Sequence, residues 1–274
     1  MTSPNEAPTG TFWDHLDALR SCLLKALAAT AACTLVAFLF RDELFGVVLA
    51  PKGAHFVTYQ VIAGVGRAVS GASFELPDFE VRLINTALAG QFAAHLRTSL
   101  FAGFCLASPY IIWLAFRFIS PALYDSERRT ALQTLVPACI MFFLGAAVDY
   151  FLIFPLAFRF LGTYQVSPDV ANAITLPSYL DTFFLTALVM GIVFEIPVLC
   201  HVLARMGLLN AGIMRHYRRH AMVGILILSA VITPTSDAVT LMLVACPMYL
   251  LYEAGVITAG GTRKRCSCDA QRKK

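Results

Sequence analysis

Charged side chains are scarce in this sequence. Only 14% of its 274 residues are Asp, Glu, Lys or Arg, whereas 58% are hydrophobic. A soluble domain carries about a quarter charged residues, because polar side chains must cover its water-facing surface. The scarcity of charge excludes an ordinary soluble domain and predicts a protein embedded in a membrane.

The sequence also lacks the motifs of familiar enzyme classes. It contains no His-Glu-x-x-His, no Gly-x-Ser-x-Gly and no glycine-rich phosphate-binding loop. Its serines and histidines are not arranged as a nucleophile with a neighbouring base. We therefore expect no enzymatic activity and no cofactor.

Cysteines are missing from the two longest polar segments, residues 41–95 and 156–178, although the chain has eight of them. A disulfide framework would be expected in such segments on an oxidising side of a membrane. Cys266 and Cys268 are one residue apart with no second pair, which is a weak signal for a metal site. We expect free thiols that pack as small apolar residues, and no bound metal.

A cleavable signal peptide is not expected. Residues 1–18 contain three acidic residues and no basic one, and the apolar stretch that follows is longer than the hydrophobic region of a signal peptide. The first apolar segment is therefore expected to remain as a membrane span.

Long apolar segments dominate the rest of the chain. Six can be marked, at about residues 19–40, 98–119, 132–154, 179–204, 221–233 and 239–259. The fifth has only thirteen residues, which span about 20 Å as a helix against a hydrocarbon core of about 30 Å. A turn signal at residues 234–237 separates it from the sixth, so we expect a short helical hairpin there.

The predicted fold is all-α, with six transmembrane helices in one domain over residues 1–259 and a basic tail over 260–274. Fifteen of the 21 Lys and Arg residues fall on one side of such a topology, the side that holds both termini. Because basic residues are enriched on the cytoplasmic side, we expect both termini in the cytoplasm. We expect the outer loop 41–95 to be partly helical and to cap the bundle.

A first polar cluster precedes the first apolar segment. Phe12, Leu16 and Leu19 recur at helical spacing, which is typical of an amphipathic helix at the membrane interface. His15, beside Asp14, is compatible with a metal or proton site. Since no second histidine is nearby, a capping or interfacial role is favoured.

A second cluster lies between the second and third apolar segments. Ser126 has the properties of a helix N-cap, and Glu127 follows where the helix dipole favours a negative charge. One interpretation is a helix start with locally paired charges. The other is that Asp125 and Glu127 present carboxylates to a cationic peptide, because a carboxylate accepts two parallel hydrogen bonds from a guanidinium group but not from an ammonium group.

The third cluster is a carboxyl group, Glu195, inside the fourth apolar segment. A carboxyl group in this position is costly and faces a cavity or a partner by default, although a structural hydrogen bond between helices is the alternative. Pro197 is expected to kink the same helix. A proton-coupled transporter of small solutes that uses Glu195 is a competing function.

Three further charged residues fall near the outer ends of predicted spans, namely Arg97, Asp149 and Arg159. Charged side chains at span ends pair with one another or extend to the interface. We expect one of these arrangements for all three.

Over about residues 12–259 the chain resembles the TatC family, the multispanning component of the twin-arginine protein translocase. The resemblance is carried by these motifs: His15-Leu16-x-x-Leu19-Arg20, Ala50-Pro51, Ser108-Pro109, Phe118 to Tyr124 followed by Glu127-Arg128-Arg129, Phe154 to Phe158, Phe194-Glu195-Ile196-Pro197, Ile232-Thr233-Pro234 with Asp237, and Pro247-Met248-Tyr249 with Tyr252-Glu253.

The resemblance implies a cupped six-helix fold in the bacterial inner membrane. It also implies that the cytoplasmic tip binds the paired arginines of signal peptides on folded export substrates. Glu127 is then the signal-binding carboxylate, with help from Asp125, while Phe118 and Pro121 shape the surface, and Glu195 with Asp237 are the intramembrane polar residues. Expected partners are single-span subunits of the TatA and TatB type and further copies in a larger complex, but no nucleic acid; transport is driven by the proton-motive force.

Two positions depart from the family pattern. Many members have a second glutamate immediately before the Leu-Arg of the first motif, where this chain has Ala18. Asp17 lies about 100° away around a helix, so it substitutes imperfectly in the arginine site or not at all. A glutamine that often follows the aspartate of the final hairpin is replaced here by Leu241. The short fifth segment is the expected contact for partner helices.

Overall fold

The structure is a computed structural model that describes residues 12–53, 56–70, 82–119, 125–165, 167, 172–206, 209, 211–233 and 237–272. Within these ranges it describes no side chain at 12, 14, 65–66, 68–70, 119, 125–131, 133 and 261–272. The described residues form helices and loops and no β-strand. A single isolated β-bridge joins Ile84 and Thr175 among these residues.

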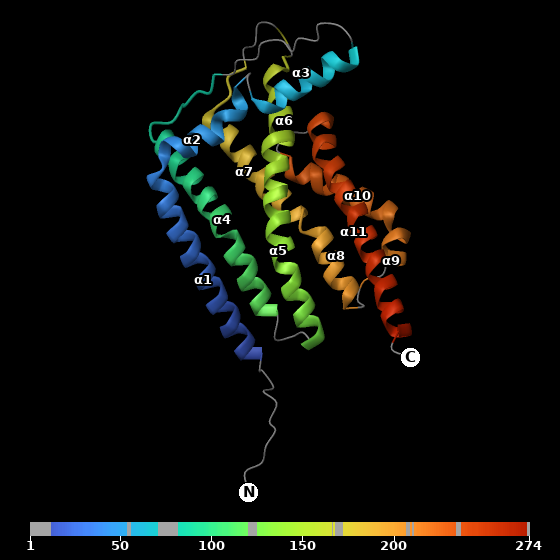
Figure 1. Ribbon diagram of the computed structural model, residues 1–274. Helices are drawn as coiled ribbons and strands as arrows, with labels where there is room; N and C mark the ends of the chain where they lie inside the picture. Colours follow the sequence, from blue (N-terminus) through green and yellow to red (C-terminus); the bar gives the residue numbers. More distant parts are fainter. Residues whose placement is uncertain are drawn as a thin grey trace.

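The helices follow one another in a simple order (Figure 1). They are α1 (Phe12–Leu39), α2 (Arg41–Leu49), the short η1 (Ala50–Lys52), α3 (Val57–Ser70), α4 (Gly90–Ile119), α5 (Asp125–Val148), the π-helical η3 (Asp149–Ile153), α6 (Phe154–Thr163), α7 (Leu176–Val193), α8 (Ile196–Arg205), α9 (Ala211–His216), α10 (Arg218–Ile232) and α11 (Ala238–Arg272). α2 and α3 lie across one end of the long helices, and α11 continues through most of the segment predicted as a separate tail.

Five of these helical stretches are long and apolar enough to cross a membrane. They cover residues 15–39, 90–118, 134–163, 176–205 and 238–260. α10, which overlaps the fifth predicted segment, has 15 residues and reaches about 22 Å, less than the hydrocarbon core of about 30 Å. The described residues therefore provide five full-length candidates and one short helix.

Two irregularities in the long helical stretches lie next to prolines. Pro155 is preceded by the π-helical turn η3, which accommodates the hydrogen bond that proline cannot donate. The helix containing Glu195 breaks into α7 and α8 at Phe194–Glu195, directly before Pro197. The predicted kink is confirmed.

α1 packs along α4 at one edge of the molecule (Figure 1). The contact is close at Gly103, where an added Cβ atom would lie 2.6 Å from the backbone nitrogen of Thr34 and 2.7 Å from its Cα atom. α5 and α7 approach similarly at Gly145, which faces the carbonyl oxygen of Met190. Glycine at these two positions sets the distance between neighbouring helices.

Three tyrosines attach the segment 41–59 to the long helices. Tyr179 donates a hydrogen bond to the Val48 carbonyl at 2.9 Å, and Tyr150 donates one to Val47 at 2.8 Å. Tyr59 lies within hydrogen-bond distance of two carbonyls, those of Pro51 at 3.2 Å and Pro155 at 2.9 Å. Burial raises the pKa of Tyr59 to about 12, so its hydroxyl remains a donor at physiological pH.

We expect Tyr59→Phe to lower the free energy of unfolding by about 1 kcal/mol, because the buried hydrogen bond donated by its hydroxyl is lost. Thermal unfolding in detergent measures the effect. Tyr164→Phe is the matched control, since Tyr164 is 63% exposed and its hydroxyl has no hydrogen-bond partner in the described part of the chain. Equal melting temperatures for the two variants would contradict the role of Tyr59.

The three charged residues expected at span ends behave differently. Arg97 pairs with Asp181 at 2.9 Å, and Arg159 lies over the Tyr59 ring at 5.3 Å. Asp149 was expected to pair or to reach the interface, and this is wrong: its side chain is 0% exposed within the helices.

The six cysteines whose side chains are described are free thiols.

Candidate functional site

The beginning of α1, the end of α4 and the beginning of α5 lie at the same end of the molecule, opposite α2 and α3 (Figure 1). This is where the first two polar clusters of the sequence meet. The His15 ring stacks on the Phe118 ring with centroids 4.4 Å apart and an interplanar angle of 30°. A residue of the first motif is thereby joined to the last turn of α4.

α5 begins at Asp125. Asp125 and Glu127 therefore belong to its first turn, where unpaired backbone N–H groups and the helix dipole favour carboxylates. Ser126 is the second residue of the helix and not its N-cap, which corrects the prediction by one to two residues. The side chains of Asp125 and Glu127, and the whole of Pro121, lie outside the described residues.

Asp17 does not share the face of α1 that carries His15. At 100° per residue it lies about 200° from His15, whereas Ala18 lies only about 60° away. Asp17 is exposed and lines a shallow surface depression of about 450 Å³ together with Arg20 and Lys25. The depression therefore holds two cationic side chains beside the Asp17 carboxylate, which makes it less favourable for a cationic peptide.

Glu195 stands at the break between α7 and α8, as its sequence context predicts. The residue is half-buried, and its Oε1 atom is buried with no hydrogen-bond partner among the described residues. A buried polar atom without a hydrogen-bond partner is unusual inside a helical protein. It can still form a hydrogen bond with a ligand or a partner protein.

Asp149 is the intramembrane carboxyl group that sequence reasoning missed. Thr186 Oγ1 donates to its Oδ2 atom at 3.2 Å, and its Oδ1 atom has no hydrogen-bond partner in the described part of the chain. The sequence pattern that identifies Glu195 also applies to Asp149, since Asp149 falls within the third apolar segment as Glu195 falls within the fourth. Its place near the segment's end led to the expectation of an interfacial residue.

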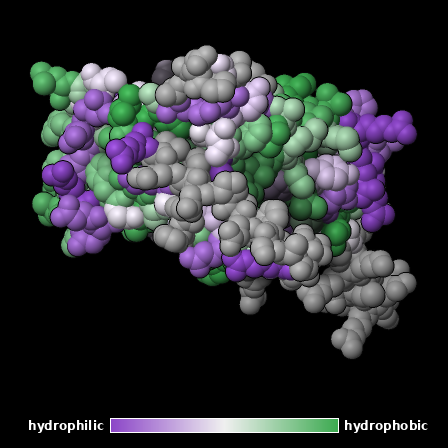
Figure 2. Space-filling model, turned by 90° about the horizontal axis from the view of Figure 1, so that it is seen from above, coloured by the Kyte–Doolittle hydropathy of each residue, from purple (hydrophilic) through white to green (hydrophobic). Residues whose placement is uncertain are grey.

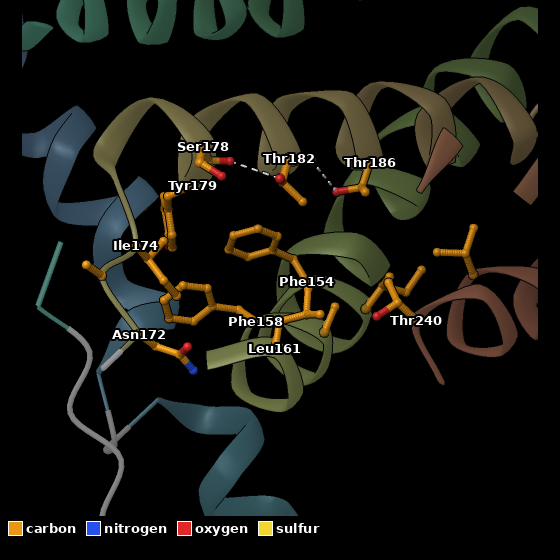
Figure 3. A pocket seen from close by; sticks show the side chains of 14 residues that line it. Phe154, Phe158, Leu161, Asn172, Ile174, Ser178, Tyr179, Thr182, Thr186 and Thr240 are labelled. Carbon is orange, nitrogen blue, oxygen red and sulfur yellow. Dashed lines mark hydrogen bonds between the residues drawn. The ribbon is translucent and has the colours of Figure 1, made fainter. Parts of the chain in front are cut away.

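A cavity of about 270 Å³ lies beside Thr186, between α6, α7 and α11 (Figure 3). Phe154 and Phe158 face a row of hydroxyls on α7. Thr182 donates to the Ser178 carbonyl at 2.9 Å, and Thr186 lies 3.0 Å from the Thr182 carbonyl. None of the described lining residues is charged, and the hydroxyls of Thr182 and Thr186 have hydrogen-bond partners within the helices. The cavity gives no support to the competing solute-transporter function.

Of the remaining motif residues, Asp237 and Glu253 form contacts within the protein. Asp237 Oδ2 accepts from the backbone N–H of Thr240 at 2.6 Å and caps the start of α11. Glu253 pairs with Arg218 at 2.5 Å, which joins α11 to α10. Pro51 is buried in η1 and Pro109 lies within α4. Leu19 and Arg20 are exposed, and Pro234 lies outside the described residues.

Comparison with known proteins shows which family has this fold and these motifs. Residues 14–247 match the family described as Sec-independent protein translocase protein (TatC). The chain belongs to the TatC family. It is 33% identical over 255 residues to the TatC protein of Deinococcus radiodurans, covering 93% of this chain and 87% of that one. It is 29% identical to the TatC protein of a Blattabacterium, covering 92% and 94%.

Solved TatC structures agree with this assignment. A crystal structure described as the twin-arginine translocase receptor TatC superposes with a TM-score of 0.69 at 28% identity, covering 89% of this chain and 97% of that chain. A second TatC crystal structure, in the detergent DDM, gives 0.70 at 27% identity. With its five long apolar helices, the chain is a multi-pass inner-membrane protein and a TatC-type subunit of the Sec-independent protein translocase.

Proposed function

We propose that this chain receives the twin-arginine signal peptides of folded proteins at the end of the molecule where α1, α4 and α5 meet. The observation that supports the proposal is the start of α5 at Asp125, which puts Asp125 and Glu127 in the first turn of a helix that begins at the end of the molecule where α4 ends. Phe118, stacked on His15, supplies an aromatic surface beside it. The receptor name of the similar crystal structure supports the same function.

The chemistry of this surface favours arginine over lysine. A carboxylate accepts two parallel hydrogen bonds from the planar guanidinium group, and an ammonium group does not reproduce that geometry. The dipole of α5 favours negative charge at the helix start and lowers the cost of placing two carboxylates there. We propose Glu127 as the main acceptor for the arginine pair, because Asp125, two residues earlier in α5, lies about 200° away around the helix. Phe118 provides an aromatic ring for the apolar part of the peptide.

We further propose that α10 completes a sixth crossing by thinning the bilayer locally, with both termini in the cytoplasm. Val223, Ile227 and Val231 of α10 are 57%, 61% and 77% exposed. They recur every four residues and so form one stripe. This stripe is the proposed contact for single-span TatA- and TatB-type partners, with which the chain assembles for export driven by the proton-motive force.

Export in the native bacterium tests the function. A folded reporter carries either an Arg-Arg signal peptide or a signal peptide for the Sec pathway, and the gene for this chain is deleted. We expect the Arg-Arg reporter to accumulate in the cytoplasm while the Sec reporter is still exported. Continued export of the Arg-Arg reporter in the deletion strain would contradict the proposal.

The departure at Ala18 leads to a prediction about the arginine site. Ala18→Glu places a carboxylate on the side of α1 that faces Phe118, and we expect about tenfold tighter binding of an Arg-Arg peptide, the value of one charge-assisted hydrogen bond. Asp17→Asn, which removes an exposed carboxylate on another face, is expected to change binding less than about threefold. Fluorescence anisotropy with a labelled peptide measures both; the reverse order of effects would show that Asp17 replaces the family glutamate.

A further inference from the structure

A second cavity lies far from the proposed peptide surface, where α2 crosses the start of α4 (Figure 1). Its volume is about 510 Å³. It is lined by Arg41, Asp42, Phe45, Leu49, Gln91, Phe92, His95 and Leu176. Seen from this end of the molecule, hydrophilic residues gather beside hydrophobic ones on the side of α1, α2 and α4 (Figure 2).

The cavity lies at the boundary of the membrane-spanning part. The apolar span of α1 ends at Leu39, and Arg41 follows after a single residue. Leu39, Phe40 and Phe92 are 75%, 56% and 65% exposed around this position. Apolar side chains exposed next to charged ones are typical of the depth at which lipid headgroups meet acyl chains.

The polar lining residues have unused binding capacity. Arg41 and Asp42 are exposed, and neither has a hydrogen-bond or ion-pair partner in the described part of the chain. They carry opposite charges side by side at the start of α2. Gln91, in the first turn of α4, adds an amide that can donate and accept.

The rings of two lining residues, His95 and Phe45, pack together, and His95 also stacks on Phe38, which does not line the cavity. His95 lies parallel to Phe38, with ring centroids 4.0 Å apart and an interplanar angle of 15°, and Phe45 lies at 6.0 Å. The buried Nε2 atom of His95 has no partner among the described residues. Aromatic lining residues next to charged and amide side chains suit a ligand that has one charged and one apolar end.

We propose that this cavity binds the headgroup of a zwitterionic phospholipid, with the phosphate on Arg41 and Gln91 and a primary ammonium group on Asp42. Arginine binds phosphate through parallel hydrogen bonds, and a carboxylate provides the matching contact for the ammonium group. The acyl chains then continue over the exposed apolar residues beside the cavity. The occupant is a lipid of the membrane in which the protein resides, of the phosphatidylethanolamine type.

Lipid binding to the purified full-length protein tests this site. The protein is delipidated in detergent and titrated with phosphatidylethanolamine or phosphatidylglycerol, and bound lipid is counted by native mass spectrometry. We expect one phosphatidylethanolamine to be retained, about tenfold more tightly than phosphatidylglycerol, because the latter lacks the ammonium group. Arg41→Gln is expected to lose about tenfold, since a charge-assisted contact to the phosphate is removed.

Arg67→Gln is the matched control, because Arg67 is exposed on α3 and does not line the cavity. Equal effects of the two arginine substitutions, or equal retention of the two lipids, would overturn the proposal and indicate unspecific annular lipid. Glycerophosphoethanolamine, the water-soluble headgroup, separates the two sources of phosphate. If it binds as tightly as the lipid, the acyl chains contribute nothing to binding and the assignment to a membrane lipid is wrong. Size-exclusion profiles confirm that both variants fold.

Discussion

Replacing Glu127 with glutamine is expected to weaken binding of an Arg-Arg signal peptide by about tenfold to a hundredfold. Loss of a hydrogen bond to a charged group costs about 1.5–3 kcal/mol, because the peptide's guanidinium loses an ionic acceptor. The substitution keeps the size of the side chain and the start of α5, so the effect is confined to the charge. The preference for Arg-Arg over Lys-Lys is expected to fall with it, because the bidentate geometry belongs to the carboxylate.

Glu43→Gln is the matched control for this substitution. Glu43 is an exposed glutamate in the first turn of α2, at the opposite end of the molecule. Anisotropy titrations of both variants with the same labelled peptide measure the difference. Wild-type affinity in Glu127→Gln, or an equal loss in the two variants, would remove Glu127 from the site and leave only a general acidic attraction.

Gly103→Ala is expected to destabilise the protein by about 2 kcal/mol or more. The new Cβ atom would meet the backbone of Thr34 at 2.6–2.7 Å, and backbone atoms cannot rotate away as a flexible side chain can. α1 must therefore separate from α4, which also loosens the stacking of His15 on Phe118. Thermal unfolding in detergent and peptide affinity are both expected to fall.

Gly224→Ala is the control for Gly103→Ala, because an added Cβ atom at Gly224 meets nothing within 4 Å. Inside the exposed helix α10 the change to alanine is expected to be neutral, or stabilising by up to about 1 kcal/mol through helix propensity. A melting temperature of Gly103→Ala equal to that of the control would show that the α1–α4 contact tolerates an extra methyl group.

Much of the fold follows from apolar runs and prolines in the sequence. Described helices overlap all six apolar segments, and the break before Pro197 lies where the missing N–H group requires it. Helix ends were less predictable. α4 begins at Gly90, eight residues before the predicted span, because Gln91, His95 and Arg97 interrupt the apolar run in its first turns.

The candidate site was predictable in part. The charge and position of Glu127 relative to a helix start could be inferred locally, since capping and dipole effects depend on neighbours in sequence. The contact between His15 and Phe118 could not, because it joins residues 103 positions apart through packing of α1 on α4. The burial of Asp149 has the same origin, as its partner Thr186 comes from another helix.

Binding of the purified protein to a signal peptide with Arg-Arg, compared with the same peptide carrying Lys-Lys, decides whether the chain is a twin-arginine receptor. The carboxylates at the start of α5 predict about tenfold or stronger preference for Arg-Arg, and a preference that persists at moderate salt because it depends on hydrogen-bond geometry. Equal, salt-sensitive binding of the two peptides, or binding of neither, would contradict a receptor function and reduce the surface to a general acidic patch.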